Sequence, residues 1–164
     1  MSAVVLSPSL RAAATAALCR EDRAAATEIL ARTLFGEAAG RPVRAVEAVA
    51  AVVMNRVRLA AMPGGPSHWG RGIAGVCRAP FQFPCWSPRH PRHAAMLEAA
   101  EDDPVFALCR RVAARAAAGV LPDPTDGATH YHDAGASPHW ALGAMPVAEI
   151  GGLVFYRLDG ASDR

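Results

Sequence analysis

In the first third of the chain, hydrophobic residues lie three or four positions apart, the spacing of a helix with one buried face. We predict two Ala-rich helices, over residues 8–19 and 22–39, because the charged segment 20–22 separates them and Asp22 can cap the second. The second helix is predicted to end at Gly40. Its buried face consists of apolar side chains at this spacing: Ile29, Leu30, Leu34 and Phe35.

A third helix is predicted from Pro42 to about Ala61, because proline suits the first turn of a helix. Its valines recur at spacings of three and four, at Val46, Val49, Val53 and Val57. A helix with so regular an apolar face is typical of the centre of a core. We therefore expect it to be the central core helix.

Residues 63–91 have a different character, because glycine and proline are dense there and no helical period is visible. The segment contains Trp69 and Trp86. We predict one long structured loop. Loops of this length inside a compact domain are usually functional, and aromatic rings on them are typical of a substrate groove.

The rest of the chain predicts two more helices and a small sheet. Residues 91–101 and 104–118 have a helical pattern, and Gly119 ends the second. Three short β-like runs follow, at 128–132, 147–150 and 153–157, with Gly151-Gly152 as the turn between the last two. We therefore predict one α+β domain over residues 1–164, mainly helical, with a small C-terminal antiparallel β element.

Composition and charge narrow the class of protein. The 164 residues are 52% hydrophobic and 20% charged, which is typical of a globular chain. The net charge is only +2, and the 17 basic residues are all scattered arginines, so no nucleic-acid partner is indicated. No apolar run reaches the roughly 18 to 20 residues of a membrane span. Arg11 is the first basic residue, so we expect no secretory signal at the N-terminus.

Glu37 is the most notable candidate for chemistry. It lies in the last turn of its predicted helix, where the partial negative charge of the helix end disfavours an ionised carboxylate. Such an environment suits a general acid. The preceding Gly36 lets another chain or a sugar approach the helix closely. The alternative is an exposed Glu37 that pairs with Arg41 four residues later.

Several ordered motifs closely resemble those of the spore-cortex-lytic-enzyme type (SleB-like) cell wall hydrolases. The resemblance covers about residues 27–157. The motifs are LFGEAAGRP at 34–42, AVAAVVMNRV at 48–57, GVCRAPFQFPCW at 75–86, GATHYH at 127–132 and IGGLVFY at 150–156.

The resemblance implies a lysozyme-like fold that acts on peptidoglycan glycan strands, with Glu37 at the position of the catalytic glutamate. The chain departs from the pattern at three places around the motifs. Many members carry an arginine and a second acid where this chain has Ala39 and Arg41, and a histidine where it has Leu153. The surroundings of Glu37 are therefore less well defined than Glu37 itself.

The acidic residues favour a reaction with a single acid. A glycosidase with two acids holds its carboxylates about 5 to 9.5 Å apart. No second acid stands out, because the others lie on the core helix, in a charged cluster or in turns: Glu47, residues 98–103, Asp123, Asp126 and Asp133. One-acid cleavage resembles the lytic transglycosylase reaction of the family, which needs no metal or cofactor. The substrate bond is then the β-1,4 bond between N-acetylmuramic acid and N-acetylglucosamine.

The motifs also supply candidate substrate-binding residues. By position they are Gln82, Phe83, Trp86, His130 and Tyr131. Hydrogen bonds to acetamido and hydroxyl groups are expected from Gln82, His130 and Tyr131. The alternatives are that Gln82 binds loop backbone, that Tyr131 packs in the sheet and that Trp86 closes the loop over the core.

A zinc-dependent amidase or peptidase is the rival enzyme class. His130 and His132 alternate on one strand and so point to the same face, which is half of a metal site. A third ligand would have to come from His139 or Asp133. We expect structural histidines and no metal, and we expect His68, His90 and His93 to face solvent. A further alternative is a non-catalytic glycan-binding component of a phage-like particle.

Four cysteines occur without a CxxC pair: Cys19, Cys77, Cys85 and Cys109. Cys77 and Cys85 flank a short loop, and we expect them to form a disulfide that holds Gln82 and Phe83; the alternative is two buried free thiols. Cys19 and Cys109 are expected to be core thiols. Without a secretory signal, we expect a wall-degrading protein to be released through a holin or carried on a phage-like particle, so a phage-derived endolysin fits.

Overall fold

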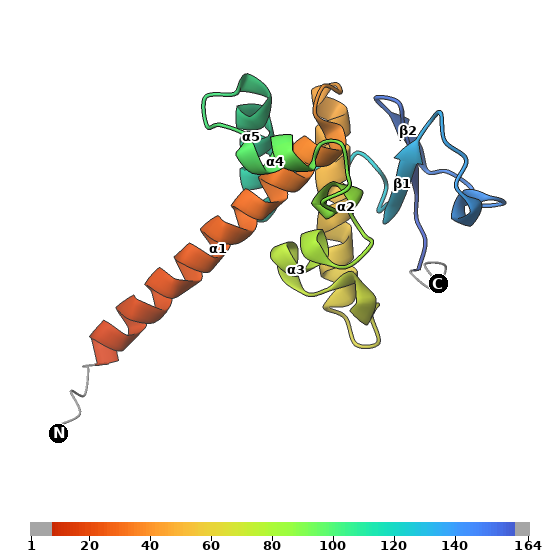
Figure 1. The fold of residues 1–164 in the computed structure, drawn as a ribbon. Coiled ribbons are helices and arrows are strands. Elements are labelled where there is room, and N and C mark those ends of the chain that lie inside the picture. The colour runs from red at the N-terminus through yellow and green to blue at the C-terminus, as the bar shows by residue number, and fades with distance from the viewer. Residues whose placement is uncertain (1–7, 160–164) are drawn as a thin grey trace.

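The structure is a computed structural model that describes residues 8–159 (Figure 1). The predicted fold class is confirmed: a mainly helical domain ends in a small antiparallel sheet. The elements are α1 (Pro8–Ala38), α2 (Val43–Ala60), the 3-10 helix η1 (Ser67–Trp69), α3 (Gly72–Arg78), η2 (Pro84–Trp86), α4 (His93–Glu98), α5 (Pro104–Ala117), β1 (His130–Asp133), η3 (His139–Ala141), β2 (Ala148–Ile150) and β3 (Leu153–Tyr156).

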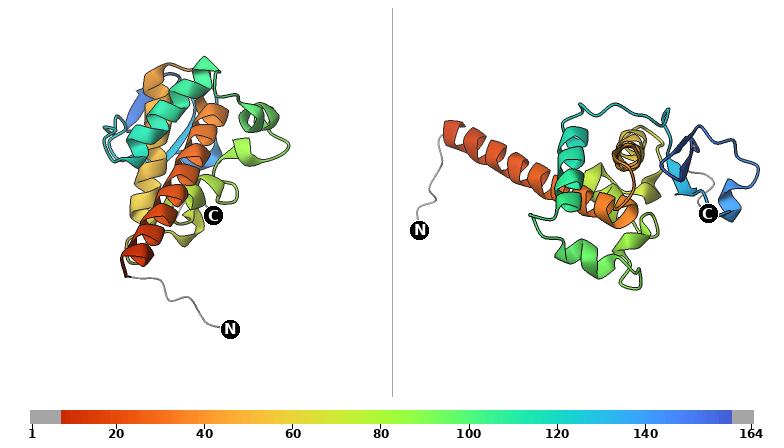
Figure 2. Two further views of the ribbon diagram at one scale, coloured as in Figure 1. Left: turned by 90° about the vertical axis from the view of Figure 1, so that its left-hand side faces the viewer. Right: turned by 90° about the horizontal axis from the view of Figure 1, so that it is seen from above.

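Helix α1 is continuous, so the predicted break at residues 20–22 is wrong. Arg20 and Asp22 are exposed, and charged side chains on the solvent side do not interrupt a helix that lacks glycine and proline there. Asp22 is therefore inside the helix and caps nothing. The first half of α1 projects away from the body of the domain (Figures 1 and 2). The predicted stop is confirmed, because α1 ends at Ala38 and Gly40 has φ +84°.

Helix α2 is the central core helix, as predicted. It lies between α5 and the strands when the molecule is seen from above (Figure 2). Its valines Val46, Val49 and Val53 are almost fully buried, and Val57 packs against the same core. Pro42 stands directly before the helix. This placement lets one helix support both the other helices and the sheet.

The prediction of one long loop over segment 63–91 is wrong, because α3 and the 3-10 helices η1 and η2 lie within it. Each is too short to display a hydrophobic period in the sequence. Trp69 is fully buried. The segment is therefore fixed to the core at several points.

The helices predicted after this segment are confirmed, with α4 and α5 inside the expected ranges. Asp103 caps α5, because its Oδ1 accepts hydrogen bonds from the N–H groups of Val105 (2.8 Å) and Phe106 (3.0 Å). Phe106 packs edge-on against Phe35 of α1 at 5.8 Å between ring centroids. This contact joins α5 to the end of α1 that carries Glu37.

The three strands form an antiparallel sheet in the order β1-β3-β2, close to the predicted ranges. The register places His130 opposite Tyr156 and Ala148 opposite Phe155. Gly151 and Gly152 turn the chain between β2 and β3 with φ of +58° and +79°, as a two-residue hairpin requires. A Cβ on Gly151 would meet the Cβ of Ala45 at 2.7 Å, so this turn packs closely on α2.

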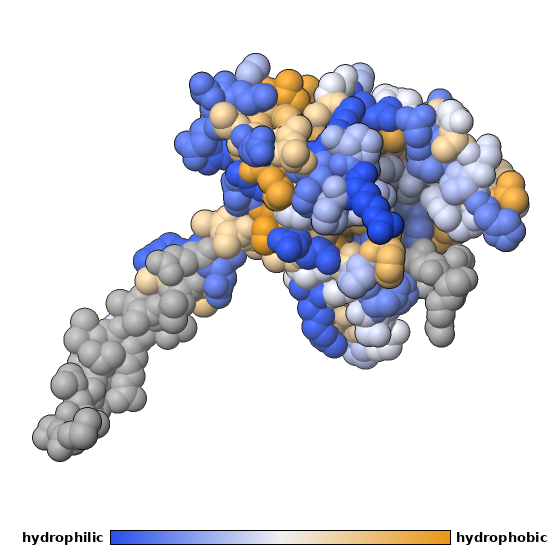
Figure 3. Space-filling model, viewed as in Figure 1, coloured by the Kyte–Doolittle hydropathy of each residue, from blue (hydrophilic) through white to orange (hydrophobic). Residues whose placement is uncertain are grey.

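The surface seen in Figure 3 is mostly hydrophilic, with small separate hydrophobic areas. Within residues 8–159, no helix combines the length and hydropathy that a membrane span needs.

Asp123 organises the turn that leads from α5 to β1. Its Oδ2 accepts from the Asn55 side-chain amide (2.9 Å) and from Gly127 N–H (2.9 Å). Its Oδ1 accepts from the backbone N–H (2.7 Å) and the hydroxyl (2.6 Å) of Thr125. Burial raises the pKa of Asp123, but these hydrogen bonds outweigh it, so the pKa lies below its ordinary value. The ionised form therefore stabilises the fold.

We expect Asp123→Asn to lower the free energy of unfolding at pH 7 by about 1 to 2 kcal/mol, because the amide NH2 faces donors. The stabilisation by Asp123 is complete above its unfolded pKa of about 4 and is lost as pH falls through the lowered folded pKa. The difference between the two proteins in urea unfolding should therefore shrink in acid. Asp126→Asn is the control. Equal stability of the Asp123 variant and wild type at pH 7 would contradict the assignment.

Candidate active site

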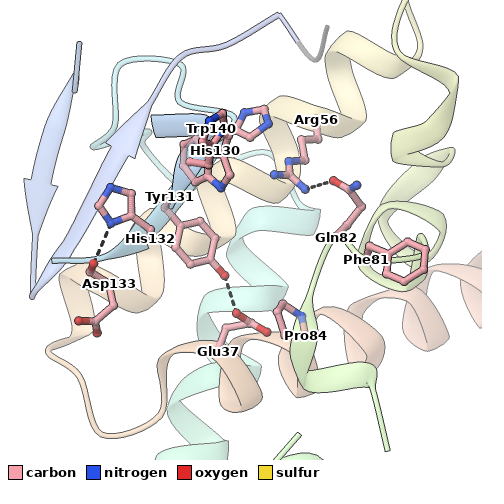
Figure 4. A pocket seen from close by; sticks show the side chains of 11 residues that line it. Glu37, Arg56, Phe81, Gln82, Pro84, His130, Tyr131, His132, Asp133 and Trp140 are labelled. Atoms are coloured by element: carbon pink, nitrogen blue, oxygen red, sulfur yellow. Dashed lines mark hydrogen bonds between the residues drawn. The ribbon is translucent and has the colours of Figure 1, made fainter. Parts of the chain in front are cut away.

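A cleft of about 640 Å³ lies where the end of α1 faces β1, with segment 81–84 on one side (Figure 4). Strand β1 and the 3-10 helix η3 form the opposite side. The residues that line it are Glu37, Arg56, Phe81, Gln82, Pro84, His130, Tyr131, His132, Asp133, His139 and Trp140. Four of the six predicted site residues are therefore brought together: Glu37, Gln82, His130 and Tyr131.

Glu37 is half-buried at the base of this cleft and holds two hydrogen bonds from distant segments. Its Oε1 accepts from the backbone N–H of Cys85 at 3.0 Å. Its Oε2 accepts from the Tyr131 hydroxyl at 2.8 Å (Figure 4). Both donors fix the orientation of the carboxyl group.

The alternative pairing of Glu37 with Arg41 is wrong. Arg41 forms an ion pair with Asp133 instead, and its other guanidinium nitrogen donates to the carbonyl of Gly151 at 2.9 Å. These bonds connect the α1–α2 turn to β1 and to the β2–β3 turn. Asp133 has a lowered pKa because it accepts from Gly135 N–H and from Arg41. Arg41 therefore positions the sheet against the end of α1.

Gly36 does permit a close approach, but the approaching group is Cys85 of the same chain. A Cβ at position 36 would lie 2.5 Å from the Cys85 Cβ and 2.9 Å from its Sγ. The same residue supplies the backbone N–H that binds Glu37. The absence of a side chain at Gly36 is therefore a condition for the contact between segment 84–86 and the acid.

Successive side chains of β1 point to opposite faces of the sheet, so Tyr131 points away from the face of His130 and His132. On that side its hydroxyl reaches Glu37. Burial raises the pKa of Tyr131 well above its ordinary value, and the charge of Glu37 and the hydrogen bond to it act in the same direction. Its hydroxyl therefore stays protonated and donates. The ring also packs against Phe155 at 5.8 Å between centroids, so the predicted packing role and the cleft role coexist.

Arg56 was not identified from the sequence as a site residue. It comes from α2, is only 5% exposed, and its guanidinium lies 5.4 Å from the ring centroids of both Trp69 and Phe83. Its Nε donates to the carbonyl of Thr129 at 2.7 Å, and its Nη1 donates to Oε1 of Gln82 at 2.6 Å. The sequence did contain a signal for Arg56, because it is a charged residue on the apolar face of a predicted core helix.

Gln82 is held by its carbonyl oxygen, so its amide NH2 group is the part that can donate to a ligand. The loop-backbone alternative for this side chain is therefore not what the structure shows.

Phe83 and Trp86, the other two predicted substrate-binding residues, do not line the cleft. Phe83 is 3% exposed beneath Arg56. Trp86 donates from Nε1 to the Thr33 hydroxyl at 3.0 Å, and Arg78 covers its ring at 4.5 Å. Both rings anchor the segment to the helices, Trp86 through Thr33 of α1 and Phe83 through Arg56 of α2.

The two strand histidines are engaged by neighbours. His130 is 4% exposed, and its Nδ1 lies 2.9 Å from the Thr129 hydroxyl. In His132, Nε2 lies 3.0 Å from the Tyr156 hydroxyl and Nδ1 lies 2.7 Å from the carbonyl of Asp133. No group of three or more histidine, cysteine or acidic side chains in residues 8–159 is arranged to hold a metal ion.

The other histidines differ in part from the prediction. His68 is exposed, as expected. His90 and His93 are half-buried, and Nδ1 of His93 lies 2.9 Å from the carbonyl of Cys85. His93 thus supports the segment whose N–H binds Glu37.

The predicted disulfide is absent, because Cys77 and Cys85 are free and buried. Burial raises the pKa of Cys77 to about 12, and burial together with the Glu37 charge raises the pKa of Cys85 still further. Both are therefore protonated thiols, and packing rather than a covalent bond holds the loop. Cys109 is a buried core thiol as predicted, with its pKa raised by burial to about 11, whereas Cys19 is exposed.

The chain belongs to the cell wall hydrolase family, because the family model described as Cell Wall Hydrolase matches residues 40–156. The match begins shortly after Glu37. This result, with the fold below, confirms the resemblance found in the motifs.

Two solved structures share the fold. The catalytic domain of the Bacillus cereus SleB protein has 24% identity and a TM-score of 0.58, over 80% of this chain and 89% of that one. The catalytic domain of the germination-specific lytic transglycosylase SleB from Bacillus anthracis has 23% identity and a TM-score of 0.59, over 80% and 93%. The lysozyme-like fold class is thereby confirmed. Among curated proteins no match is found.

We expect Gly36→Ala to lower the free energy of unfolding by about 1 to 3 kcal/mol and to reduce the release of fragments from cell walls, because the new Cβ displaces Cys85. Gly75→Ala is the matched control, since its Cβ would have no neighbour closer than 3.7 Å. Thermal melts and turbidity assays of both variants test this. A Gly36 variant as active and stable as the Gly75 variant would contradict the contact.

We expect Tyr131→Phe to fold normally but to lose activity by about 10-fold or more, because one of the two donors on Glu37 disappears. Tyr156→Phe removes a hydroxyl from the same sheet without touching Glu37 and should be far less affected. Initial rates on purified cell walls compare the two. The assignment fails if both variants lose the same activity.

Proposed function

We propose that the protein cleaves the glycan strands of peptidoglycan at the β-1,4 bond between N-acetylmuramic acid and N-acetylglucosamine, as a lytic transglycosylase. The observation that carries this proposal is the position of Glu37: a half-buried acid at the base of an open cleft, oriented by Cys85 N–H and the Tyr131 hydroxyl. Membership of the cell wall hydrolase family supports the substrate class.

The reaction uses Glu37 first as an acid and then as a base. Protonated Glu37 donates its proton to the bridging glycosidic oxygen while the bond to the muramic sugar breaks. The N-acetyl group of the substrate stabilises the cationic sugar, and the two donors stabilise the Glu37 carboxylate that has formed. This carboxylate then accepts the proton of the C6 hydroxyl, whose oxygen closes a 1,6-anhydro ring. Glu37 is thus protonated again, and no water is consumed.

Asp133 is the other acidic residue among those that line the cleft, and its surroundings favour the one-acid reaction. Its Oδ2 is paired with Arg41, and its Oδ1 accepts from Gly135 N–H at 2.9 Å. Hydrogen bonds from Gly135 N–H and Arg41 hold the pKa of Asp133 below its ordinary value, so its carboxylate is a weak base toward water. We therefore assign Asp133 to positioning, through Arg41.

The assignment of Glu37 as the catalytic acid is tested by Glu37→Gln, which keeps the shape of the side chain but removes the transferable proton. We expect digestion of purified peptidoglycan to fall by at least about 100-fold with an unchanged thermal melt. Asp126→Asn, which changes an exposed acid outside the cleft, is the control and should retain the activity. Wild-type-like digestion by the Glu37 variant would show that the acid lies elsewhere.

Mass spectrometry of the wild-type products separates the possible outcomes. Muropeptides with 1,6-anhydromuramic ends support the transglycosylase reaction. Reducing muramic ends would indicate hydrolysis and a role for a second acid, with Asp133 as the first to examine. Binding to glycan strands without release of fragments would identify a non-catalytic glycan-binding protein and overturn the proposal.

A further inference from the structure

Phe81 combines two features that an aromatic residue rarely shows. It lines the cleft, yet its side chain is fully exposed, at 101% of its reference surface. Its backbone has φ +64°, in the left-handed region that bulky residues disfavour. Phe81 therefore gains nothing from burial and carries backbone strain.

The neighbours of Phe81 hold the strained conformation in place. Gln82 N–H donates to the carbonyl of Ala79 at 3.2 Å, which closes a turn across positions 80 and 81. On the other side, Gln82 is bound to Arg56, and Phe83 is buried. The turn would form at least as easily with glycine at position 81. The ring is thus displayed by the loop and does not build it.

The position of the Phe81 ring indicates which kind of ligand it can contact. Figure 4 shows Phe81 on the segment that faces β1 across the cleft, on the same loop as Gln82 and Pro84. The other residues that line the cleft present both hydrogen-bonding groups, such as Gln82 and His132, and apolar surfaces, such as Pro84 and Trp140. An exposed ring at the edge of such a mixed lining suits a ligand with apolar faces and polar edges. A pyranose ring has this character, because its C–H groups point to the faces and its hydroxyl groups point outward.

We propose that Phe81 binds a sugar ring of the glycan strand by stacking at the rim of the cleft, and so determines the affinity for extended strands. This inference rests on the proposed function and adds a sugar-binding position to it. Phe81 is a substrate-positioning residue and takes no part in the proton transfers at Glu37. When the sugar covers the ring, the apolar surface that is exposed in the free protein is buried.

Phe81→Gly is the sharpest test, because glycine accepts the positive φ and removes only the ring. We expect thermal stability to stay equal or to rise. With soluble peptidoglycan glycan strands of several disaccharides, we expect KM to increase about 5-fold to 10-fold with kcat unchanged. Phe81→Trp should retain a KM near the wild-type value. Met62→Ala is the matched control, since Met62 is 54% exposed and does not line the cleft.

The binding step is also measured without turnover, by co-sedimentation of Glu37→Gln and of the Glu37→Gln/Phe81→Gly double variant with purified peptidoglycan. Weaker binding of the double variant supports the inference. An unchanged KM and unchanged co-sedimentation would overturn it, as would a loss of kcat alone or a marked fall in thermal stability. If wild type releases no glycan fragments, the proposed function fails, whereas an active wild type with an equally active Phe81→Gly variant overturns only the role of Phe81.

Discussion

The hydrogen bond between Glu37 and Tyr131 is the contact on which the arrangement of the site depends, because it joins residues 94 positions apart in the chain. Glu37 lies in the last turn of α1 and Tyr131 on the small sheet, so the bond forms only when helices and sheet have both docked on α2. A carboxyl group that first donates and then accepts a proton must be held in a fixed orientation. Here two donors hold it, and the missing side chain of Gly36 lets the second donor, Cys85, come close.

The buried Arg56 stabilises the segments around the Glu37–Tyr131 hydrogen bond. Arg56 lies between the rings of Trp69 and Phe83 and binds the Thr129 carbonyl, next to β1, as well as the Gln82 side chain. A buried charge is unfavourable without partners, so these hydrogen bonds and ring contacts tie the loop and the strand to α2. The outer contact is the Arg41–Asp133 pair, at the other end of β1. The cleft is thus bounded by segments that two arginines hold in place.

Much of the fold could be predicted from the sequence, because its elements follow local periodicity. The valine spacing of α2 identified the central helix, and Gly151-Gly152 identified the hairpin turn. The incorrect predictions of secondary structure have local reasons as well. The charged residues at 20–22 do not break α1, and α3 is too short to show a period. For the site, the motifs identified Glu37, Gln82 and Tyr131, which the cleft brings together.

Local periodicity along the chain thus determined most of the helices and strands, and the family motifs identified the candidate acid. Only the tertiary structure decided the partners of that acid, because Arg41 is its neighbour in sequence but pairs with Asp133 in space. It also turned Phe83 and Trp86 away from the cleft, left Cys77 and Cys85 as free thiols, and placed Arg56 beside Gln82. The physical reason is that burial and hydrogen bonding depend on which surfaces meet after docking, and the spacing of residues along one segment carries no information about those surfaces.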